Sequence, residues 1–123
     1  MMLIIGVEVK PILTIISVNY NSQCFKEIVV KHLKSLSLIP LPKEIIILDN
    51  GSEDSSFQII LETIADLSSK ITNTLYKVVR LSKNFGFLRA INIGLKLMDK
   101  DSKFVMIINN DCIVDRKSTR LNS

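Results

Sequence analysis

Residues 43–51 are KEIIILDNG, in which four aliphatic residues stand between a charged pair and an Asp-Asn-Gly sequence. A short run rich in β-branched residues and bounded by polar residues predicts a strand that is buried on both faces. The Asp-Asn-Gly sequence favours a tight turn directly after that strand. The stretch therefore predicts one strand of an interior sheet, and the segments around it supply the other elements.

Three further segments have the pattern of strands. Residues 12–18 are apolar except for Thr14 and Ser17, residues 76–81 alternate weakly, and residues 104–108 form another apolar run. Each run is short and bounded by polar or turn residues, which favours a strand over a helix.

The segments between the strands have helical periodicity. Apolar residues recur at helical spacing within residues 25–36, 57–71 and 87–98, which predicts three amphipathic helices. Ser55 and Gln58, three places apart, predict a capping box at the start of the second helix. The order β-α-β-α-β-α-β predicts an α/β, Rossmann-like fold in which a mostly parallel sheet carries helices on both faces.

Length and composition exclude several classes of protein. The chain has 123 residues, of which 47% are hydrophobic, and this suits one compact domain. No apolar run reaches the roughly 18 residues that span a bilayer, so we expect no transmembrane segment. Residues 2–9 are apolar but lack the basic start of a signal peptide.

The cysteine and histidine content points to a reducing compartment. Cys24 and Cys112 lie far apart in the sequence, and His32 is the single histidine. We therefore expect neither a zinc site nor a disulfide, and we expect a cytoplasmic protein. His32 is predicted on the polar side of its helix and is assigned no role.

The net charge of +4 is uneven along the chain. Residues 116–123 contain three basic residues, which account for three of the four excess charges. This segment is polar, follows abruptly on an apolar strand and resembles a translated sequencing adapter, so we expect a domain at 1–115 and a non-native tail at 116–123. The remaining lysines form no basic stripe, so nucleic acid is not an expected partner.

Polar residues follow all four predicted strands. The endings are Asn19-Tyr20-Asn21, Asp49-Asn50-Gly51-Ser52, Ser82-Lys83-Asn84 and Asn109-Asn110-Asp111. Ligands of open parallel sheets bind beyond the carboxyl ends of the strands, so these side chains are expected at one binding edge. Any single ending is equally explained by the turn preferences of Asn, Asp and Gly, but four at one edge favour a ligand.

The chemistry of this edge suits a nucleotide and a divalent cation. Amide and carboxylate groups can match the donors and acceptors of a nucleobase. The chain has only four glycines, and neither the dinucleotide-binding nor the P-loop glycine spacing is present. The charge of a diphosphate would then be neutralised by Mg²⁺ or Mn²⁺, for which Asp111 is the best-placed ligand.

Four segments in order resemble the motifs of family 2 glycosyltransferases. They are VNYN at 18–21, LDNGSED at 48–54, NFGFLRAINIG at 84–94 and INND at 108–111. Their order and spacing agree with the family over residues 12–114, and the similarity is greatest to its rhamnosyltransferase-like bacterial members. The resemblance implies the nucleotide-sugar-binding half of a GT-A fold, and so the N-terminal portion of a longer, inverting transferase.

The resemblance also implies roles for individual residues. The positions expected to border the nucleotide sugar are Val18, Tyr20, Asn21, Asp49, Asn50, Asn84, Gly86, Arg89, Asn92 and Asn110. Val18 and the ring of Tyr20 would border the base, and either Asp49 or Asn50 would bond its edge. The third motif would border the ribose and diphosphate, and Asp111 would hold the metal.

Two departures from the family pattern affect this prediction. The acidic motif retains one carboxylate, Asp111, where many members have two or three. The acceptor half, which carries the general base, is absent, so we predict no catalytic residue within the chain. The resemblance implies a UDP- or dTDP-linked donor and a glycan or lipid-linked acceptor, in polysaccharide or cell-surface glycan synthesis at the inner face of the membrane.

Two other readings of the sequence were weighed. One is a non-catalytic nucleotide-binding fragment, because the chain lacks the acceptor site and the base. A response-regulator-like α/β domain would instead need clustered acidic residues after the first strand, where this chain has Asn19-Tyr20-Asn21.

Overall fold

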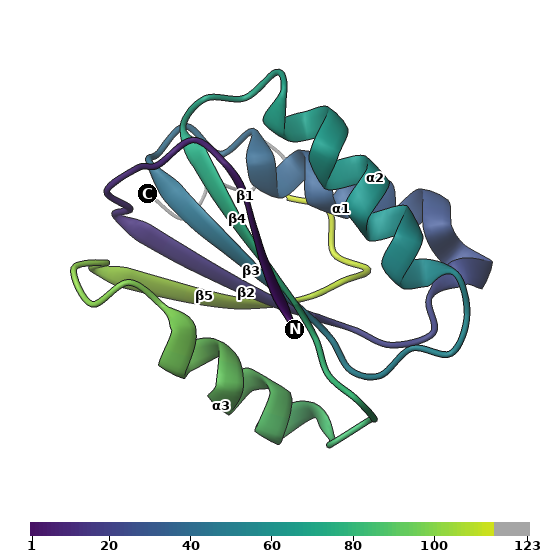
Figure 1. Cartoon of the computed structure of the whole chain (residues 1–123). Coiled ribbons are helices and arrows are strands. Elements are labelled where there is room, and N and C mark those ends of the chain that lie inside the picture. The colour runs from purple at the N-terminus through teal and green to yellow at the C-terminus, as the bar shows by residue number, and fades with distance from the viewer. Residues whose placement is uncertain (115–123) are drawn as a thin grey trace.

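The computed structural model describes residues 1–114 (Figure 1). The strands are β1 (Met2–Gly6), β2 (Leu13–Asn19), β3 (Lys43–Asp49), β4 (Thr74–Arg80) and β5 (Phe104–Asn109). The helices are α1 (Lys26–Ser37), preceded by the 3-10 turn η1 (Gln23–Phe25), α2 (Ser56–Ser68) and α3 (Phe87–Leu97). All four predicted strands and all three predicted helices are present; the prediction of a tail at 116–123 lies outside the described residues.

One five-stranded sheet organises the domain, with strand order β1-β4-β3-β2-β5. Strands β2 to β5 are parallel and β1 pairs antiparallel with β4. Numbered from β2, the parallel strands have the order 3-2-1-4, which is the Rossmann order rather than the 2-1-3-4 order of flavodoxin-like receivers. The predicted fold class is confirmed, and the receiver alternative is wrong.

The strand order also explains the placement of the helices. The chain moves from β2 to β4 in one direction across the sheet and then returns past β2 to reach β5. Right-handed crossovers in opposite directions put their helices on opposite faces of a sheet. Accordingly, α1 and α2 cover one face and α3 covers the other (Figure 1).

β3 lies at the centre of the core, and all seven of its residues are buried. Ile45 and Ile47 face α1 and α2, whereas Ile46 and Leu48 face α3. On the α3 side, a Cβ at Gly94 would lie 2.9 Å from side-chain atoms of Ile16 and Leu48. Glycine at this position therefore allows α3 to pack directly on the sheet.

Three details of the sequence prediction are wrong. Residues 2–6 form the edge strand β1, which was not predicted, although its residues pair with β4 from Met2↔Val79 to Gly6↔Leu75. Ser55 makes no side-chain cap; instead the Asp54 carboxylate accepts bonds from the Ser56 amide and hydroxyl. His32 is fully buried rather than on a polar helix face, because Ser17 and the Cys112 carbonyl satisfy its ring nitrogens.

A buried ion pair lies at the end of the sheet opposite the polar strand endings. Glu44 is fully buried, and its Oε2 accepts hydrogen bonds from Thr14 Oγ1 at 2.7 Å and the Asp99 amide at 2.6 Å. Its Oε1 has no hydrogen bond of good geometry but lies 2.6 Å from Lys77 Nζ. Lys77 is therefore the group that compensates the buried negative charge.

We expect the substitution Lys77→Met to destabilise the fold by about 3–5 kcal/mol, because it leaves Glu44 charged, buried and without its cation. Urea unfolding followed by circular dichroism measures this loss. The double variant Glu44→Gln/Lys77→Met should recover most of it, and Lys96→Met on the exposed side of α3 is the matched control. Equal stability of Lys77→Met and Lys96→Met would contradict the assigned role.

Candidate functional site

The polar strand endings meet where the direction of the chain across the sheet reverses. β5 pairs with β2 on the side away from β3, so the reversal lies between β2 and β5. In open α/β sheets, the carboxyl ends of the two strands at such a point diverge and leave a crevice. The strand order alone therefore places a binding crevice beside the ends of β2 and β5.

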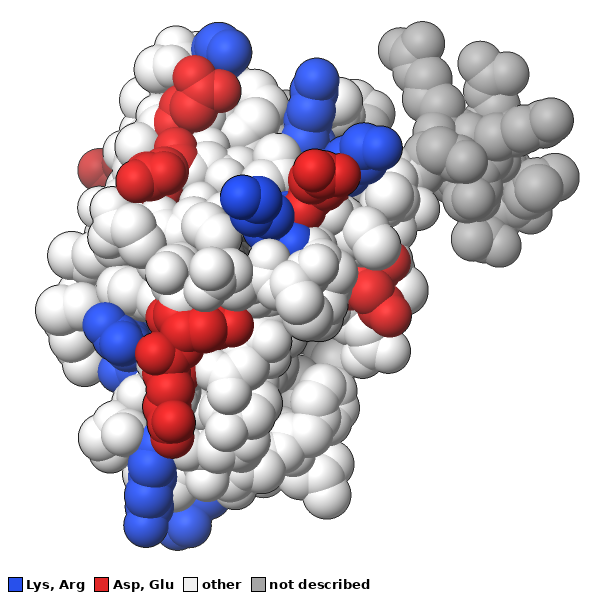
Figure 2. Space-filling model, turned by 90° about the vertical axis from the view of Figure 1, so that its right-hand side faces the viewer, with Lys and Arg blue, Asp and Glu red and all other residues white. Residues whose placement is uncertain are grey.

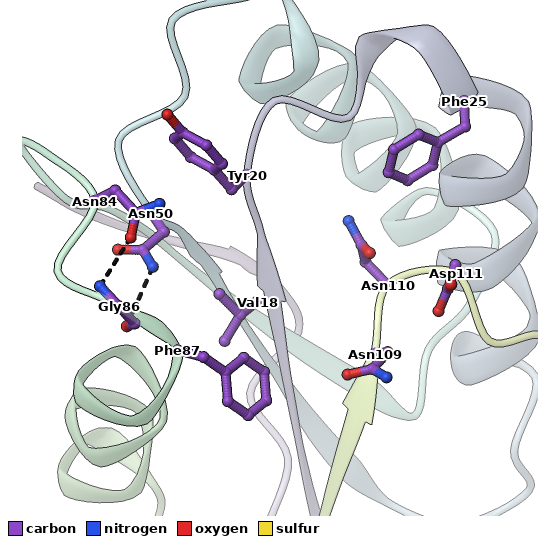
Figure 3. A pocket seen from close by; sticks show the side chains of 10 residues that line it. All are labelled: Val18, Tyr20, Phe25, Asn50, Asn84, Gly86, Phe87, Asn109, Asn110 and Asp111. Carbon is purple, nitrogen blue, oxygen red and sulfur yellow. Dashed lines mark hydrogen bonds between the residues drawn. The ribbon is translucent and has the colours of Figure 1, made fainter.

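A hollow of about 400 Å³ occupies this position (Figure 3). Its volume lies within the range of small-molecule sites, roughly 300–1,000 Å³. The lining residues are Val18, Tyr20, Phe25, Asn50, Asn84, Gly86, Phe87, Asn109, Asn110 and Asp111. They come from the ends of β2 and β5, from the residues just after β2, β3 and β5, from the loop before α3 and its first residue, and from η1.

Asn19 joins three strand ends behind the hollow. Its side-chain nitrogen donates to Asp49 Oδ1 at 2.9 Å, and its side-chain oxygen accepts from Asn110 Nδ2 at 3.0 Å. Asn19 is almost fully buried, so these bonds form away from water. The contact fixes the end of β2 relative to the ends of β3 and β5.

The partners of the Asp49 carboxylate all belong to the protein's own fold. Its carboxylate is fully buried and accepts from the Ser52 amide at 3.2 Å and the Ser52 hydroxyl at 2.6 Å. Arg80 Nε lies 3.9 Å from Oδ2 of the Asp49 carboxylate. These bonds close the turn after β3, and Asp49 does not line the hollow.

Asn50 lines the hollow, but its amide binds the backbone of the loop before α3. Its Nδ2 donates to the Gly86 carbonyl at 3.2 Å, and its Oδ1 accepts from the Phe85 amide at 3.0 Å. Asn50 is 3% exposed. The amide of Asn50 therefore holds this loop against the end of β3.

The same two loops approach each other closely at Gly51. This residue has a φ of +76°, and a Cβ there would lie 2.4 Å from the carbonyl carbon of Lys83. Asn84 completes the arrangement, because its Oδ1 accepts from the Gly86 amide at 2.8 Å. The wall of the hollow formed by residues 84–86 is thus fixed by bonds from the Asn50 and Asn84 side chains to its backbone and by the close approach of Gly51.

Asp111 supplies the carboxylate of the hollow. It is exposed in the turn after β5, which the Cys112 amide closes by donating to the Asn109 carbonyl at 3.1 Å. Within residues 1–114, no group of three or more His, Cys, Asp or Glu residues could hold a metal ion. This donor set fits Mg²⁺ or Mn²⁺, since Mg²⁺ commonly takes one or two protein carboxylates, water and the phosphates of a substrate.

The structure brings together seven of the residues expected at the site: Val18, Tyr20, Asn50, Asn84, Gly86, Asn110 and Asp111. Four others lie outside the hollow. Besides Asp49, they are Asn21, whose Oδ1 accepts from the Glu53 amide, Arg89, which lies over the ring of Phe85, and Asn92, which is exposed on α3.

Sequence reasoning gave no specific site role to three residues of the lining. Phe25 and Phe87 were attributed to the apolar sides of helices, and Asn109 was expected at the binding edge, as part of the ending of the fourth strand, but was assigned no contact. Phe25 lies just before α1, Phe87 at the start of α3 and Asn109 at the end of β5. These positions could have identified them, because residues there share the edge of the sheet at which ligands bind in this class of fold.

A second, wider hollow adjoins the first and shares Tyr20 and Asn84 with it. Its lining adds Arg80 and Lys83, and its volume is about 1,010 Å³. Tyr20 is 43% exposed and stands between the two spaces. The ring is therefore accessible to a flat ligand group.

The charged side chains are distributed without a single dominant sign on the face shown in Figure 2. Lysine and arginine side chains alternate with aspartate and glutamate, and wide uncharged areas separate them. This face offers no continuous basic stripe of the kind that tracks a nucleic-acid backbone.

A mostly parallel sheet of Rossmann order with a hollow at its point of reversal defines an α/β domain of the Rossmann-like class. The chain belongs to glycosyl transferase family 2, whose family pattern matches residues 14–120. In a comparison with curated protein sequences, no match is found.

Solved structures of GT-A glycosyltransferases share the fold. S. aureus TarS 1–349 superposes with a TM-score of 0.68 at 22% identity, over 89% of this chain and 30% of that one. The mannosyltransferase PcManGT from Pyrobaculum calidifontis, in complex with GDP-Man and Mn²⁺, superposes with a TM-score of 0.74 at 19% identity, over 92% of this chain and 31% of that one. S. aureus TarS 1–349 has also been solved with UDP-GlcNAc. The chain thus spans less than a third of the length of these proteins.

We expect Asn50→Asp to loosen the loop before α3. A carboxylate can accept from the Phe85 amide but cannot donate to the Gly86 carbonyl, so the loss should be about 1–3 kcal/mol. Urea unfolding measures the stability, and hydrogen exchange of residues 84–86 measures the loop. The control Asn92→Asp makes the same chemical change on the exposed side of α3 and should stay within about 0.5 kcal/mol. If the two variants behave alike, Asn50 does not hold the loop.

Proposed function

We propose that the hollow at the ends of β2 and β5 binds the nucleoside diphosphate part of a sugar donor, and that the protein transfers the sugar to an acceptor hydroxyl. The observation that carries the proposal is the convergence of seven expected residues on one hollow at the reversal point. Membership of glycosyl transferase family 2 supports the reaction class.

The base is proposed to lie against Tyr20. An exposed aromatic ring at a strand end offers a stacking surface, and such stacking contributes about 1–3 kcal/mol per base. Asp49 is saturated by Ser52, Asn19 and Arg80, and both ends of the Asn50 amide hold backbone groups. Stacking on Tyr20 and contacts with the neighbouring backbone are therefore the main determinants of base binding.

The diphosphate is proposed to lie toward Asp111, with a divalent cation held by its carboxylate and by phosphate oxygens. PcManGT was solved with Mn²⁺ and GDP-Man, which supports a cation in the family. A bound cation would act as a Lewis acid toward the departing nucleoside diphosphate. Asn110 positions the turn through Asn19, and Gly86 leaves the opposite wall free of a side chain.

We propose an inverting reaction on a UDP- or dTDP-linked donor, the latter in keeping with the rhamnosyltransferase-like motifs. The acceptor is a glycan or a lipid-linked saccharide of bacterial polysaccharide or cell-surface glycan synthesis. Within residues 1–114, no helix is long and apolar enough to cross a bilayer. A cytoplasmic location, at the inner face of the membrane where lipid-linked acceptors reside, is part of this proposal.

A second candidate function is nucleotide binding without catalysis. Among the residues that line the hollow, Asp111 is the one carboxylate, and the proposed cation would occupy it. A general base must lie within hydrogen-bond reach of the acceptor hydroxyl. Sugar transfer to an acceptor by the 123-residue chain alone, beyond donor hydrolysis, would exclude this second candidate.

The cation hypothesis predicts that Asp111→Asn weakens Mn²⁺-dependent binding of UDP or dTDP by about tenfold or more, which corresponds to about 1.4 kcal/mol. Isothermal titration with and without Mn²⁺ measures the effect, and binding without metal should change little. Asp101→Asn, in an exposed loop before β5, is the matched control. Equal Mn²⁺ dependence in both variants would rule out Asp111 as the metal ligand.

The stacking hypothesis predicts different results for two substitutions of Tyr20. Tyr20→Phe retains the ring and should bind the nucleotide nearly as well as the wild type. Tyr20→Ala removes the ring and should weaken binding by about 1–3 kcal/mol. The same titrations measure both, and the hypothesis is wrong if the alanine variant binds as tightly as the phenylalanine variant.

A further inference from the structure

The segment that follows β5 and carries Asp111 runs back alongside α1 (Figure 1). Two α1 side chains, one helical turn apart, bind its backbone. His32 Nδ1 lies 2.5 Å from the Cys112 carbonyl oxygen, and Ser35 Oγ accepts from the Val114 amide at 3.0 Å. Together with the bond from Asn110 to Asn19, these contacts hold the segment on both sides of Asp111.

The protonation of the His32 ring follows from its partners. A carbonyl oxygen can only accept, so Nδ1 carries the proton and donates to Cys112. His32 is fully buried, and desolvation lowers the pKa of its ring, which is therefore neutral near pH 7. The unprotonated Nε2 accepts from the Ser17 hydroxyl, 2.9 Å away in β2.

We infer that His32 and Ser35 are positioning residues, which hold the Asp111 turn in the geometry that binds the cation and diphosphate. This inference rests on the proposed function, because it assumes that Asp111 binds the cation of the sugar donor. An exposed turn without such bonds would sample many orientations of Asp111. Substitution of residues whose hydrogen bonds orient a metal ligand typically lowers metal affinity by about 10- to 100-fold.

Two substitutions of His32 separate its two hydrogen bonds. The amide nitrogen of asparagine can take the place of Nδ1, so His32→Asn can retain the bond to Cys112. The amide of glutamine reaches the place of Nε2, so His32→Gln can retain the bond to Ser17 but loses the bond to Cys112. We expect His32→Gln to weaken Mn²⁺ affinity in the presence of UDP by about tenfold or more, and His32→Asn to restore much of it.

The experiment uses the whole 123-residue chain and two measurements. Electron paramagnetic resonance of Mn²⁺ in the presence of UDP gives the metal affinity. Hydrogen exchange of residues 110–114 without metal gives the order of the turn, and it should be faster in His32→Gln than in His32→Asn. Wild-type affinity together with wild-type exchange in His32→Gln would overturn the inference.

Ser35→Ala keeps the test decisive if a change at the buried His32 prevents folding. Ser35 is only partly buried, and alanine is favourable in a helix. We expect faster exchange at Val114 and weaker Mn²⁺ binding, relative to the control Ser68→Ala, whose hydroxyl bonds only its own helix α2. Unchanged exchange and affinity in Ser35→Ala would overturn the role of α1.

The wild-type chain distinguishes failure of this inference from failure of the proposed function. If the wild type binds neither UDP nor Mn²⁺, the proposed function is wrong, and if the wild type and Asp111→Asn bind them equally, the cation role of Asp111 is wrong. Hydrogen exchange of residues 110–114 then decides by itself whether α1 holds the turn. If the wild type binds in an Asp111-dependent manner and His32→Gln does so equally well, only the positioning role is wrong.

Discussion

The buried side chain of Asn19 is the contact on which the geometry of the site depends. It donates to Asp49 and accepts from Asn110, and it thereby links the ends of three parallel strands. Ser52, in the turn after β3, and Ser56, at the start of α2, extend the network at 3.3 and 3.1 Å from the same amide nitrogen. Hydrogen bonds between buried polar groups are costly to leave unmade, so this network strongly favours a single arrangement of the strand ends.

The network lies where it does because of the sheet topology. Right-handed crossovers carry the chain from β2 to β4, and the return to β5 opens a crevice between neighbouring strands. Side chains after β2, β3 and β5 are thus brought together although they are distant in sequence. The polar residues then divide into two groups: buried ones that bond each other, and more exposed ones, such as Tyr20 and Asp111, that face the hollow.

The sequence was sufficient for the α/β fold, because the change between strand and helix periodicity is a local property. It was also sufficient to place the polar strand endings at one edge of the sheet, since parallel strands place their carboxyl ends together. It could not separate Asp49 from Asn50. Their neighbouring positions look equivalent in sequence and both residues are buried, whereas their partners differ and only Asn50 lines the hollow.

The burial of His32 and the strand β1 are two further features that the sequence did not predict. A histidine among lysines suggests a solvated helix face, and only the long-range contacts with Ser17 and Cys112 reveal that it is buried. β1 is a short apolar run at the edge of the sheet, and the sequence did not show that it pairs antiparallel with β4, because the paired residues lie 69 to 77 positions apart. Contacts of this kind are set by the tertiary structure and have no short-range pattern.

The hydrogen bonds of Asn19 give a physical reason for the single carboxylate in the Asn109-Asn110-Asp111 motif. Asn110 donates to Asn19 Oδ1, and Asn19 in turn donates to the buried carboxylate of Asp49. An aspartate at position 110 could not donate, and Asn19 could satisfy it only by turning its amide away from Asp49. Two carboxylates would then compete for one amide in a buried site, which is costly because unpaired buried charges are poorly solvated. The amide at position 110 therefore follows from the way the strand ends are joined, and it leaves Asp111 as the carboxylate that lines the hollow.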